Sequence, residues 1–189
     1  MTSPQAVDIE HLDGKWWLQD TQLSDALEPV LKGQNVPYLA RKAMLLANIS
    51  ETIQTKTSPN GIKALVVTKA AAGLKGHSDT FDGTGEQVMM GGSGYFGGEA
   101  AAVRSWWVDD LASATHAATG KPLDPYLLEG WNDEGKYFVS CGDKSNMSDV
   151  SVWGFCVIGG KRYRAVKYYI RNGDQEVRAR IVYAWAGKE

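Results

Sequence analysis

Hydrophobic and polar residues alternate with a period of two over most of the chain, and this alternation is typical of β-strands that bury one face. It predicts eight strands, at residues 11–18, 49–55, 62–68, 100–108, 136–141, 150–158, 161–171 and 174–185. Gly159-Gly160 and Asn172-Gly173 join the last three strands and suit two-residue hairpin turns, whose central residues need a positive φ. No internal repeat or linker interrupts the pattern, so the sequence predicts one antiparallel β domain over residues 1–189.

Three segments depart from this alternation. Ser24 can cap a helix from residue 25 to about residue 31, which ends at Gly33. Pro37 suits the first turn of a second helix, whose apolar face is marked by Leu39, Ala43 and Leu46. The glycine-rich residues 83–98 are compatible with a kinked strand or a mobile loop. Residues 109–134 are rich in alanine at first, and we expect a partly helical excursion over one end of the strands.

The two hairpin turns also predict which side chains point inward, because turn length fixes the register of paired strands. Across the second turn Tyr168 pairs with Val177 and Arg164 with Ile181; across the first, Phe155 pairs with Arg164. Directly paired residues share a face. The predicted inner face carries Trp153, Phe155, Val157, Arg162, Arg164, Val166, Tyr168, Ile170, Val177, Ala179, Ile181 and Tyr183. The predicted solvated face carries Lys167, Tyr169, Arg171, Asp174, Glu176, Arg178 and Arg180.

Two arginines stand out on the inner face, because charged side chains are rarely buried without a partner. Arg162 lies beside the Gly-Gly turn and fits the rim of a barrel. Arg164 lies one pleat deeper, and two interpretations stay open: it contacts a ligand, or it has a structural or rim role. Trp106 and Trp107 are adjacent, so in a strand one ring must point inward and the other outward. We predict that Trp106 is the one that lines the cavity.

Composition excludes several classes of protein. The net charge of −2 and the interspersed charges give no basic surface for nucleic acid, and no apolar run is long enough to span a membrane. The polar first eleven residues lack a secretory segment, so we expect a cytoplasmic monomer or weak homodimer. Two cysteines are too few for a disulfide scaffold or a zinc site. Cys141 pairs near Val150, about 20 Å from Cys156 along the strand, so both thiols should be free.

Candidate catalytic chemistry is sparse. The histidines His11, His77 and His116 show no metal-ligand spacing with cysteines or carboxylates, and no nucleophile elbow, P-loop or dinucleotide fingerprint occurs. We therefore expect neither a metal nor a cofactor. His77 lies two residues before Asp79 and could act as a general base beside a carboxylate; the alternative is a polar turn between strands.

Several short motifs carry a family resemblance. They are Asp13-Gly14-Lys15-Trp16, Leu-Ser-Asp at 23–25, Arg-Lys-Ala at 41–43 and Arg-Ile-Val-Tyr at 180–183. Together with the helix pair and the final hairpins, they resemble the fatty-acid-binding branch of the calycins, and more closely the small lipocalin-like proteins of filamentous fungi associated with natural-product pathways. The resemblance implies an all-β protein with minor α content: a single antiparallel calycin-type barrel with a helix-turn-helix lid. It also implies a lipid-sized cavity and a basic side chain stacked on Trp16 at the base.

The sequence departs from fatty-acid binders at the ligand anchor. Those proteins grip a carboxylate with Arg-x-Tyr on the last strand, whereas here Tyr183 is kept and Ile181 stands in place of the arginine. The resemblance therefore leaves Arg164 with Tyr183 as a displaced anchor. The predicted ligand-binding residues are Trp106, Trp153, Phe155, Arg164, Tyr168, Ile181 and Tyr183, and the catalytic candidates are Arg164, Tyr168 and Tyr183.

Three functions stay open at this point. The barrel could carry or sequester a hydrophobic metabolite of polyketide, terpenoid or lipid type. It could also act as a cofactor-independent cyclase or isomerase, which would leave no catalytic motif because confinement and a few hydrogen bonds can promote such a reaction. A role in protein interaction is the third.

Overall fold

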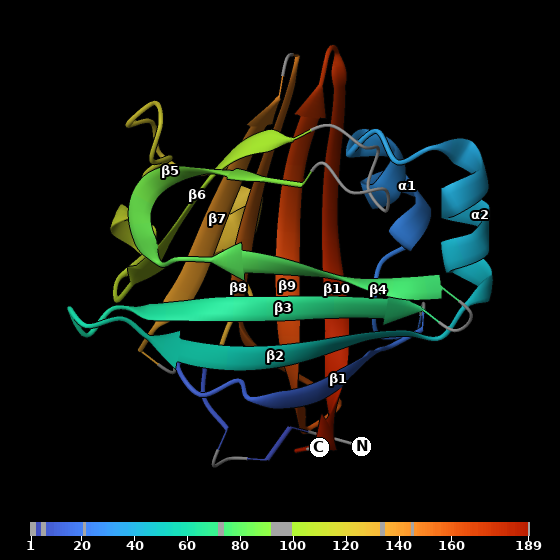
Figure 1. The fold of residues 1–189 in the computed structure, drawn as a ribbon, viewed down its shortest axis with the longest axis horizontal. Helices are drawn as coiled ribbons and strands as arrows, with labels where there is room; N and C mark the ends of the chain where they lie inside the picture. The colour runs from blue at the N-terminus through green and yellow to red at the C-terminus, as the bar shows by residue number, and fades with distance from the viewer. Residues whose placement is uncertain are drawn as a thin grey trace.

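The computed structural model describes residues 3–4, 7–20, 22–71, 74–91, 100–132, 135–144 and 146–188. Ten antiparallel strands form one sheet in the order β4-β3-β2-β1-β10-β9-β8-β7-β6-β5 (Figure 1). The strands are β1 (Gly14–Leu18), β2 (Ile49–Thr57), β3 (Lys63–Ala71), β4 (Leu74–Phe81), β5 (Thr84–Met90), β6 (Ala101–Val108), β7 (Tyr137–Lys144), β8 (Met147–Ile158), β9 (Lys161–Asn172) and β10 (Gln175–Gly187). The predicted all-β class with minor helix is confirmed.

The sheet curls into a nearly closed barrel. β1 to β4 run across β8 to β10 at a steep angle, and β1 continues from one group to the other by pairing with both β2 and β10 (Figure 1). β4 and β5 form the two edges of the sheet, and among the described residues no β-pairing joins them. The barrel therefore has one seam without backbone pairing. No helix in the described part of the chain is long and apolar enough to cross a membrane.

The two final hairpins confirm the predicted faces and correct one register. Phe155 pairs with Arg164 as predicted, and Gly159 and Gly160 both have positive φ. In the next hairpin the loop is Gly173-Asp174, so Tyr183 rather than Ile181 lies opposite Arg164. Gly173 has a φ of 57° at the first central position, which suits a type II′ turn. The shift is two residues, so every side chain stays on its predicted face.

The helix pair forms near its predicted position, as α1 (Leu27–Gly33) and α2 (Tyr38–Leu46), but two details of the prediction are wrong. Ser24 does not cap α1; its hydroxyl accepts a hydrogen bond from the backbone N–H of Val182 at 2.9 Å. The predicted apolar face of α2 is not buried, since Leu39 is 81% and Leu46 91% exposed. Met44 is the α2 residue that packs inward.

The segment 109–134 corrects a further prediction. It contains the 3-10 helix η1 (Leu111–Ser113) and the short helix α3 (Pro125–Leu128), and it covers the outer face of the barrel rather than one end. Its leucines form an outer hydrophobic cluster with side chains of β7 and β8. The cluster includes Leu111, Leu123 and Leu127 of the segment, and Val139, Val150 and Val152 of the strands. β7 and β8 bury both of their faces, so their outer apolar side chains need this cover.

Lys167 lies beneath the same cover, although the sequence placed it on the solvated face. Its ammonium group donates hydrogen bonds to the backbone carbonyls of Tyr126, at 2.9 Å, and Glu129. Trp106 also points outward into this cluster, whereas Trp107 points inward and its ring centroid lies 4.7 Å from that of Phe138. The prediction that Trp106 lines the cavity is wrong, because the pairing of Trp107 with the buried Phe138 fixes the opposite face as the inner one.

Candidate functional site

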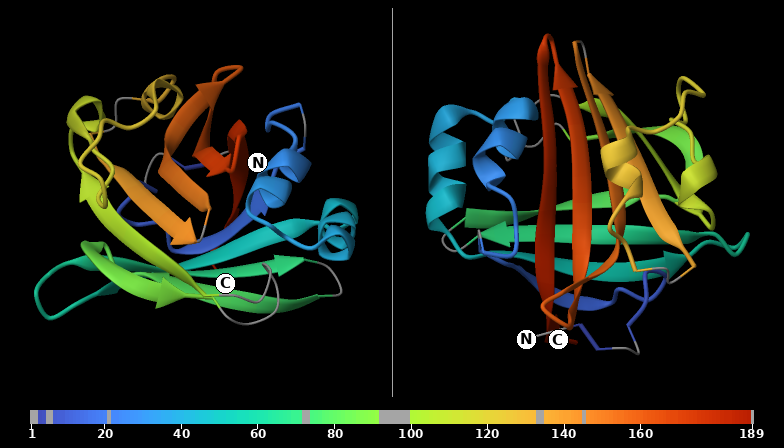
Figure 2. Two further views of the ribbon diagram at one scale, coloured as in Figure 1. Left: turned by 90° about the horizontal axis from the view of Figure 1, so that it is seen from above. Right: turned by 180° about the vertical axis from the view of Figure 1, so that it is seen from behind.

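A pocket of about 220 Å³ lies inside the barrel. A cavity needs only about 10–15 Å³ to hold one water molecule, so this pocket has room for an organic molecule. Helix α1 contributes Leu27, Val30 and Leu31 to its wall, and α2 contributes Met44. Figure 2 shows α1 and α2 side by side at one end of the barrel. The helix pair therefore covers one end of the pocket, as the predicted lid would.

Four of the predicted ligand-binding residues line the pocket: Trp153, Tyr168, Ile181 and Tyr183. Phe155 does not. It lies deeper in the core, where its ring centroid is 6.3 Å from that of Trp16 and the Arg162 guanidinium stacks on it at 3.5 Å. The strand alternation placed these side chains on the correct face, but it did not show how far along the strand the cavity extends.

Arg164 is fully buried and forms an ion pair with the Glu51 carboxylate. Tyr183 donates its hydroxyl to the other carboxylate oxygen of Glu51, at 3.1 Å. The guanidinium lies 4.0 Å from the Tyr183 ring centroid and 5.2 Å from that of Trp16, so Trp16 has the stacked basic side chain that the resemblance implies. Glu51 and Tyr183 line the pocket, whereas Arg164 does not. Of the two roles considered for Arg164, the geometry thus favours a structural role over contact with a ligand.

The sequence contained a signal for Glu51 that the prediction did not use. Glu51 stands between Ile49 and Ile53 in an alternating strand, and Ile53 is fully buried. A carboxylate in the apolar register of a strand needs a buried partner, and Arg164 was the one unexplained buried cation. Their pairing across 113 residues could have been inferred from these two observations together.

The two pocket tyrosines are hydrogen-bond donors rather than bases. Burial raises the pKa of Tyr183 well above its usual value, and the nearby Glu51 carboxylate raises it further. Burial also raises the pKa of Tyr168, and Glu51 again adds to the shift. Both phenols therefore stay protonated at neutral pH. The Tyr183 hydroxyl already donates to Glu51, so Tyr168 is the tyrosine that can donate to an oxygen atom of a bound molecule.

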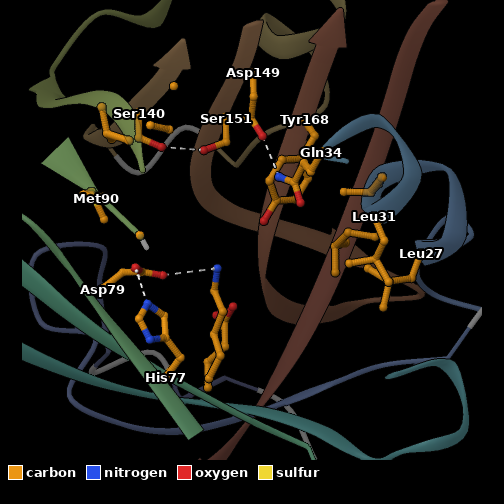
Figure 3. Close-up of a pocket in the computed structure, with 18 of the residues that line it drawn as sticks. Leu27, Leu31, Gln34, His77, Asp79, Met90, Ser140, Asp149, Ser151 and Tyr168 are labelled. Atoms are coloured by element: carbon orange, nitrogen blue, oxygen red, sulfur yellow. Dashed lines mark hydrogen bonds and ion pairs between the residues drawn. The ribbon is translucent and has the colours of Figure 1, made fainter. Parts of the chain in front are cut away.

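A second polar group lies directly beneath the lid. Asp149, on β8, faces the pocket, and the side-chain amide of Gln34 donates to its Oδ2 at 2.5 Å (Figure 3). Burial raises the pKa of the Asp149 carboxyl, and the Gln34 hydrogen bond offsets only part of this effect. Ser140 and Ser151 also line the pocket, and their hydroxyls share a hydrogen bond of 2.8 Å. The prediction named none of these residues.

His77 and Asp79 line the pocket from β4, and they correct the polar-turn interpretation of this segment. Nε2 of His77 lies 3.1 Å from Oδ1 of Asp79 (Figure 3). The Lys69 ammonium lies 3.9 Å from Oδ2 of the same carboxylate. The two residues share a face because they are two apart in a strand. The general-base alternative considered for His77 therefore has the required carboxylate and the required access to the pocket.

One group of possible metal ligands also forms, contrary to the expectation from sequence spacing. Ligand atoms of His116, Cys141 and Asp143 all lie within 4.8 Å of one another. Cys141 packs in the outer cluster, so this group lies outside the barrel pocket. Both Cys141 and Cys156 are free thiols, as predicted.

Comparison with known proteins supports the fold and gives one whole-length relative. No family model matches the chain. It is 28% identical over 201 residues to the "Probable pericyclase scpY" of Mollisia scopiformis, a match that covers 99% of this chain and 96% of that protein. Crystal structures of the fluorescent protein UnaG, one of a mutant and one of the wild type, superpose with TM-scores of 0.57 and 0.56. Each is 13% identical and covers 94% of this chain, and the matches span 98% and 99% of the UnaG chains. The fold is a calycin-type β-barrel, as the sequence predicted.

Proposed function

We propose that the barrel binds a hydrophobic small molecule of a natural-product pathway in its pocket and promotes a pericyclic reaction of that molecule without a cofactor. The observation that carries this proposal is a largely apolar internal pocket with a few fixed hydrogen-bonding groups, in a chain that matches a "Probable pericyclase" along almost its whole length. The same pocket would serve a carrier, so the two functions differ only in whether the bound molecule is converted.

The pocket supplies what such a reaction needs. A pericyclic reaction rearranges bonds within one cyclic array of atoms, so its barrier falls when a flexible molecule is held in a folded shape. Aromatic and aliphatic walls, among them Trp153 and Ile181, can impose that shape. Hydrogen-bond donors fixed in a water-poor site stabilise charge that develops on an oxygen atom in the transition state. Tyr168 and Asp149 face the pocket and can provide them.

Gene deletion combined with mass spectrometry tests this proposal. An intramolecular pericyclic reaction conserves every atom, so a deletion strain should lose one metabolite and accumulate an isomer of identical mass. Purified protein added to that isomer should restore the original product with no added metal or cofactor. Binding of the isomer without conversion would leave the carrier function and contradict the pericyclase. If deletion changes no metabolite, the pathway role itself is wrong.

A further inference from the structure

We infer that the pocket selects an uncharged molecule that carries a hydrogen-bond-accepting oxygen, such as a ketone or ester carbonyl, and that the Asp149 carboxyl donates to this oxygen. The inference rests on the proposed function, because it names the substrate class of the same pocket. Two independent features carry it: the position where a ligand carboxylate would be held is filled by the protein's own carboxylate, and another carboxyl in the pocket forms no ion pair with any described residue.

The first feature is the occupied anion site. Arg164 and Tyr183 converge on one carboxylate, and that carboxylate belongs to Glu51 of β2. Glu51 lines the pocket while Arg164 lies behind it with no exposed surface. A ligand carboxylate that approached Arg164 would therefore meet the negative charge of Glu51 first. The Arg164 charge is already balanced by Glu51, so the ion pair offers a ligand anion no net attraction, and the nearer carboxylate repels it.

Among the described residues, the other ionisable side chains of the pocket give it no excess of positive charge. Lys69 and His77 both contact Asp79, so both side chains are engaged by a carboxylate of the protein. Lys144 also lines the pocket. With Asp149 protonated, the pocket wall carries the carboxylates of Glu51 and Asp79 against the ammonium groups of Lys69 and Lys144.

The second feature is the environment of Asp149. Within the described part of the chain, its carboxyl forms no ion pair, and its one hydrogen bond comes from the Gln34 amide to Oδ2. Because Oδ2 accepts this bond, the acidic proton belongs on Oδ1, and among the described residues no hydrogen bond engages Oδ1 of this pocket-lining side chain. Burial raises the pKa of Asp149 and so favours this protonated form. A neutral carboxyl group of this kind is a hydrogen-bond donor.

A carbonyl oxygen is the natural acceptor for that donor. The proton stays on Asp149, and the hydrogen bond draws electron density toward the carbonyl oxygen, which activates a conjugated double bond toward cyclisation. Gln34 follows directly after α1, so the helix that covers the pocket also orients the carboxyl. The polar end of the substrate should therefore lie beneath α1, and its hydrocarbon part should extend along the aromatic wall.

A matched pair of fluorescent polyenes separates charge from shape. Cis-parinaric acid and its methyl ester have the same hydrocarbon chain and the same carbonyl carbon, but only the acid is anionic at pH 7. We expect the full-length protein to bind the ester at least tenfold more tightly than the acid. Asp149→Leu should weaken ester binding about tenfold. Asp143→Leu is the matched control, because Asp143 lies on the neighbouring strand β7 outside the pocket, and it should leave both affinities unchanged.

Glu51→Gln gives an independent check. It removes the negative charge but keeps an acceptor for the Tyr183 hydroxyl, so the acid should bind more tightly to this variant than to the wild type. Circular dichroism shows whether each variant is folded, and the comparison of acid with ester needs only the wild-type protein. If the acid binds as tightly as the ester, or if folded Asp149→Leu binds the ester like the wild type, the inference is wrong while the binding pocket stands. If neither polyene binds the wild type, both this inference and the proposed function are wrong.

Discussion

Replacement of Arg164 by methionine should destabilise the fold, and the size of the loss follows from the burial of its ion pair. The Arg164 side chain has no exposed surface and that of Glu51 is 4% exposed. Removal of Arg164 would leave the Glu51 carboxylate buried with, among the described residues, the Tyr183 hydroxyl as its one remaining side-chain partner. Removing one partner of a buried ion pair typically costs about 3–5 kcal/mol. For a chain of 189 residues this corresponds to a melting temperature lower by roughly 6–20 °C.

Urea unfolding followed by tryptophan fluorescence measures this loss. Arg171→Met is the matched control, since the Arg171 side chain is 59% exposed and its ion-pair partner Glu176 is 37% exposed, so this pair lies at the surface. Surface ion pairs contribute little to stability, so the control should lose far less. The double variant Arg164→Met with Glu51→Gln removes both buried charges and should recover about 2 kcal/mol relative to Arg164→Met alone.

Two results would refute this reasoning. If Arg164→Met unfolds within about 1 kcal/mol of the wild type, the ion pair is not the buried contact that the geometry describes. If the double variant is no more stable than Arg164→Met, the loss comes from packing on Tyr183 and Trp16 rather than from an unpaired carboxylate.

Three further predictions concern stability and reactivity. Trp16→Ala should lower the free energy of unfolding by about 3–5 kcal/mol in the same assay, because it empties a fully buried site at the base of the barrel; an equally stable variant would contradict that role. Cys141 and Cys156 should react with a thiol reagent only slowly in the native state and both completely in denaturant, since burial raises the pKa of Cys141 to about 11 and that of Cys156 above its usual value. Asp149→Asn should gain stability relative to the wild type as the pH rises from 4 to 7 in denaturant unfolding. The folded-state pKa of Asp149 is raised above 3.8, so over this range the folded protein keeps a proton that the unfolded chain releases, and the wild type loses stability as the pH rises. A difference between the two proteins that does not change with pH would show that Asp149 is not buried in this way.

The strands and their faces could be predicted because periodicity is a local property. The alternation over 161–171 and 174–185 assigned Tyr168, Ile181 and Tyr183 to the inner face, and they are there. The register of the last hairpin could not be derived in the same way. Asn172-Gly173 and Gly173-Asp174 are both acceptable turns, and the second is the one that forms. In that register the side chain of Asn172 donates a hydrogen bond to the backbone carbonyl of Gly33 at 3.0 Å. That contact joins segments 139 residues apart.

The polar part of the site was less predictable, because its members come from distant strands. Asp149 continues the alternation of Ser151 and Trp153 toward the start of β8, but the predicted strand began one residue after it. Its partner Gln34 lies 115 residues away, at the end of α1. Trp106 was assigned to the wrong face for a related reason: alternation separates it from Trp107 but does not say which of the two meets the core.

The central claim, that a hydrophobic molecule binds inside the barrel, is tested most directly by filling the pocket. Ala101 lines the pocket on β6, and its neighbour Ala102 lies on the opposite face of the same strand. Equilibrium titration with the methyl ester of cis-parinaric acid should show at least a tenfold loss of affinity for Ala101→Phe, because the added ring occupies part of the roughly 220 Å³ cavity. Ala102→Phe should bind like the wild type. Equal binding by both folded variants would place the ligand outside the barrel and contradict the account.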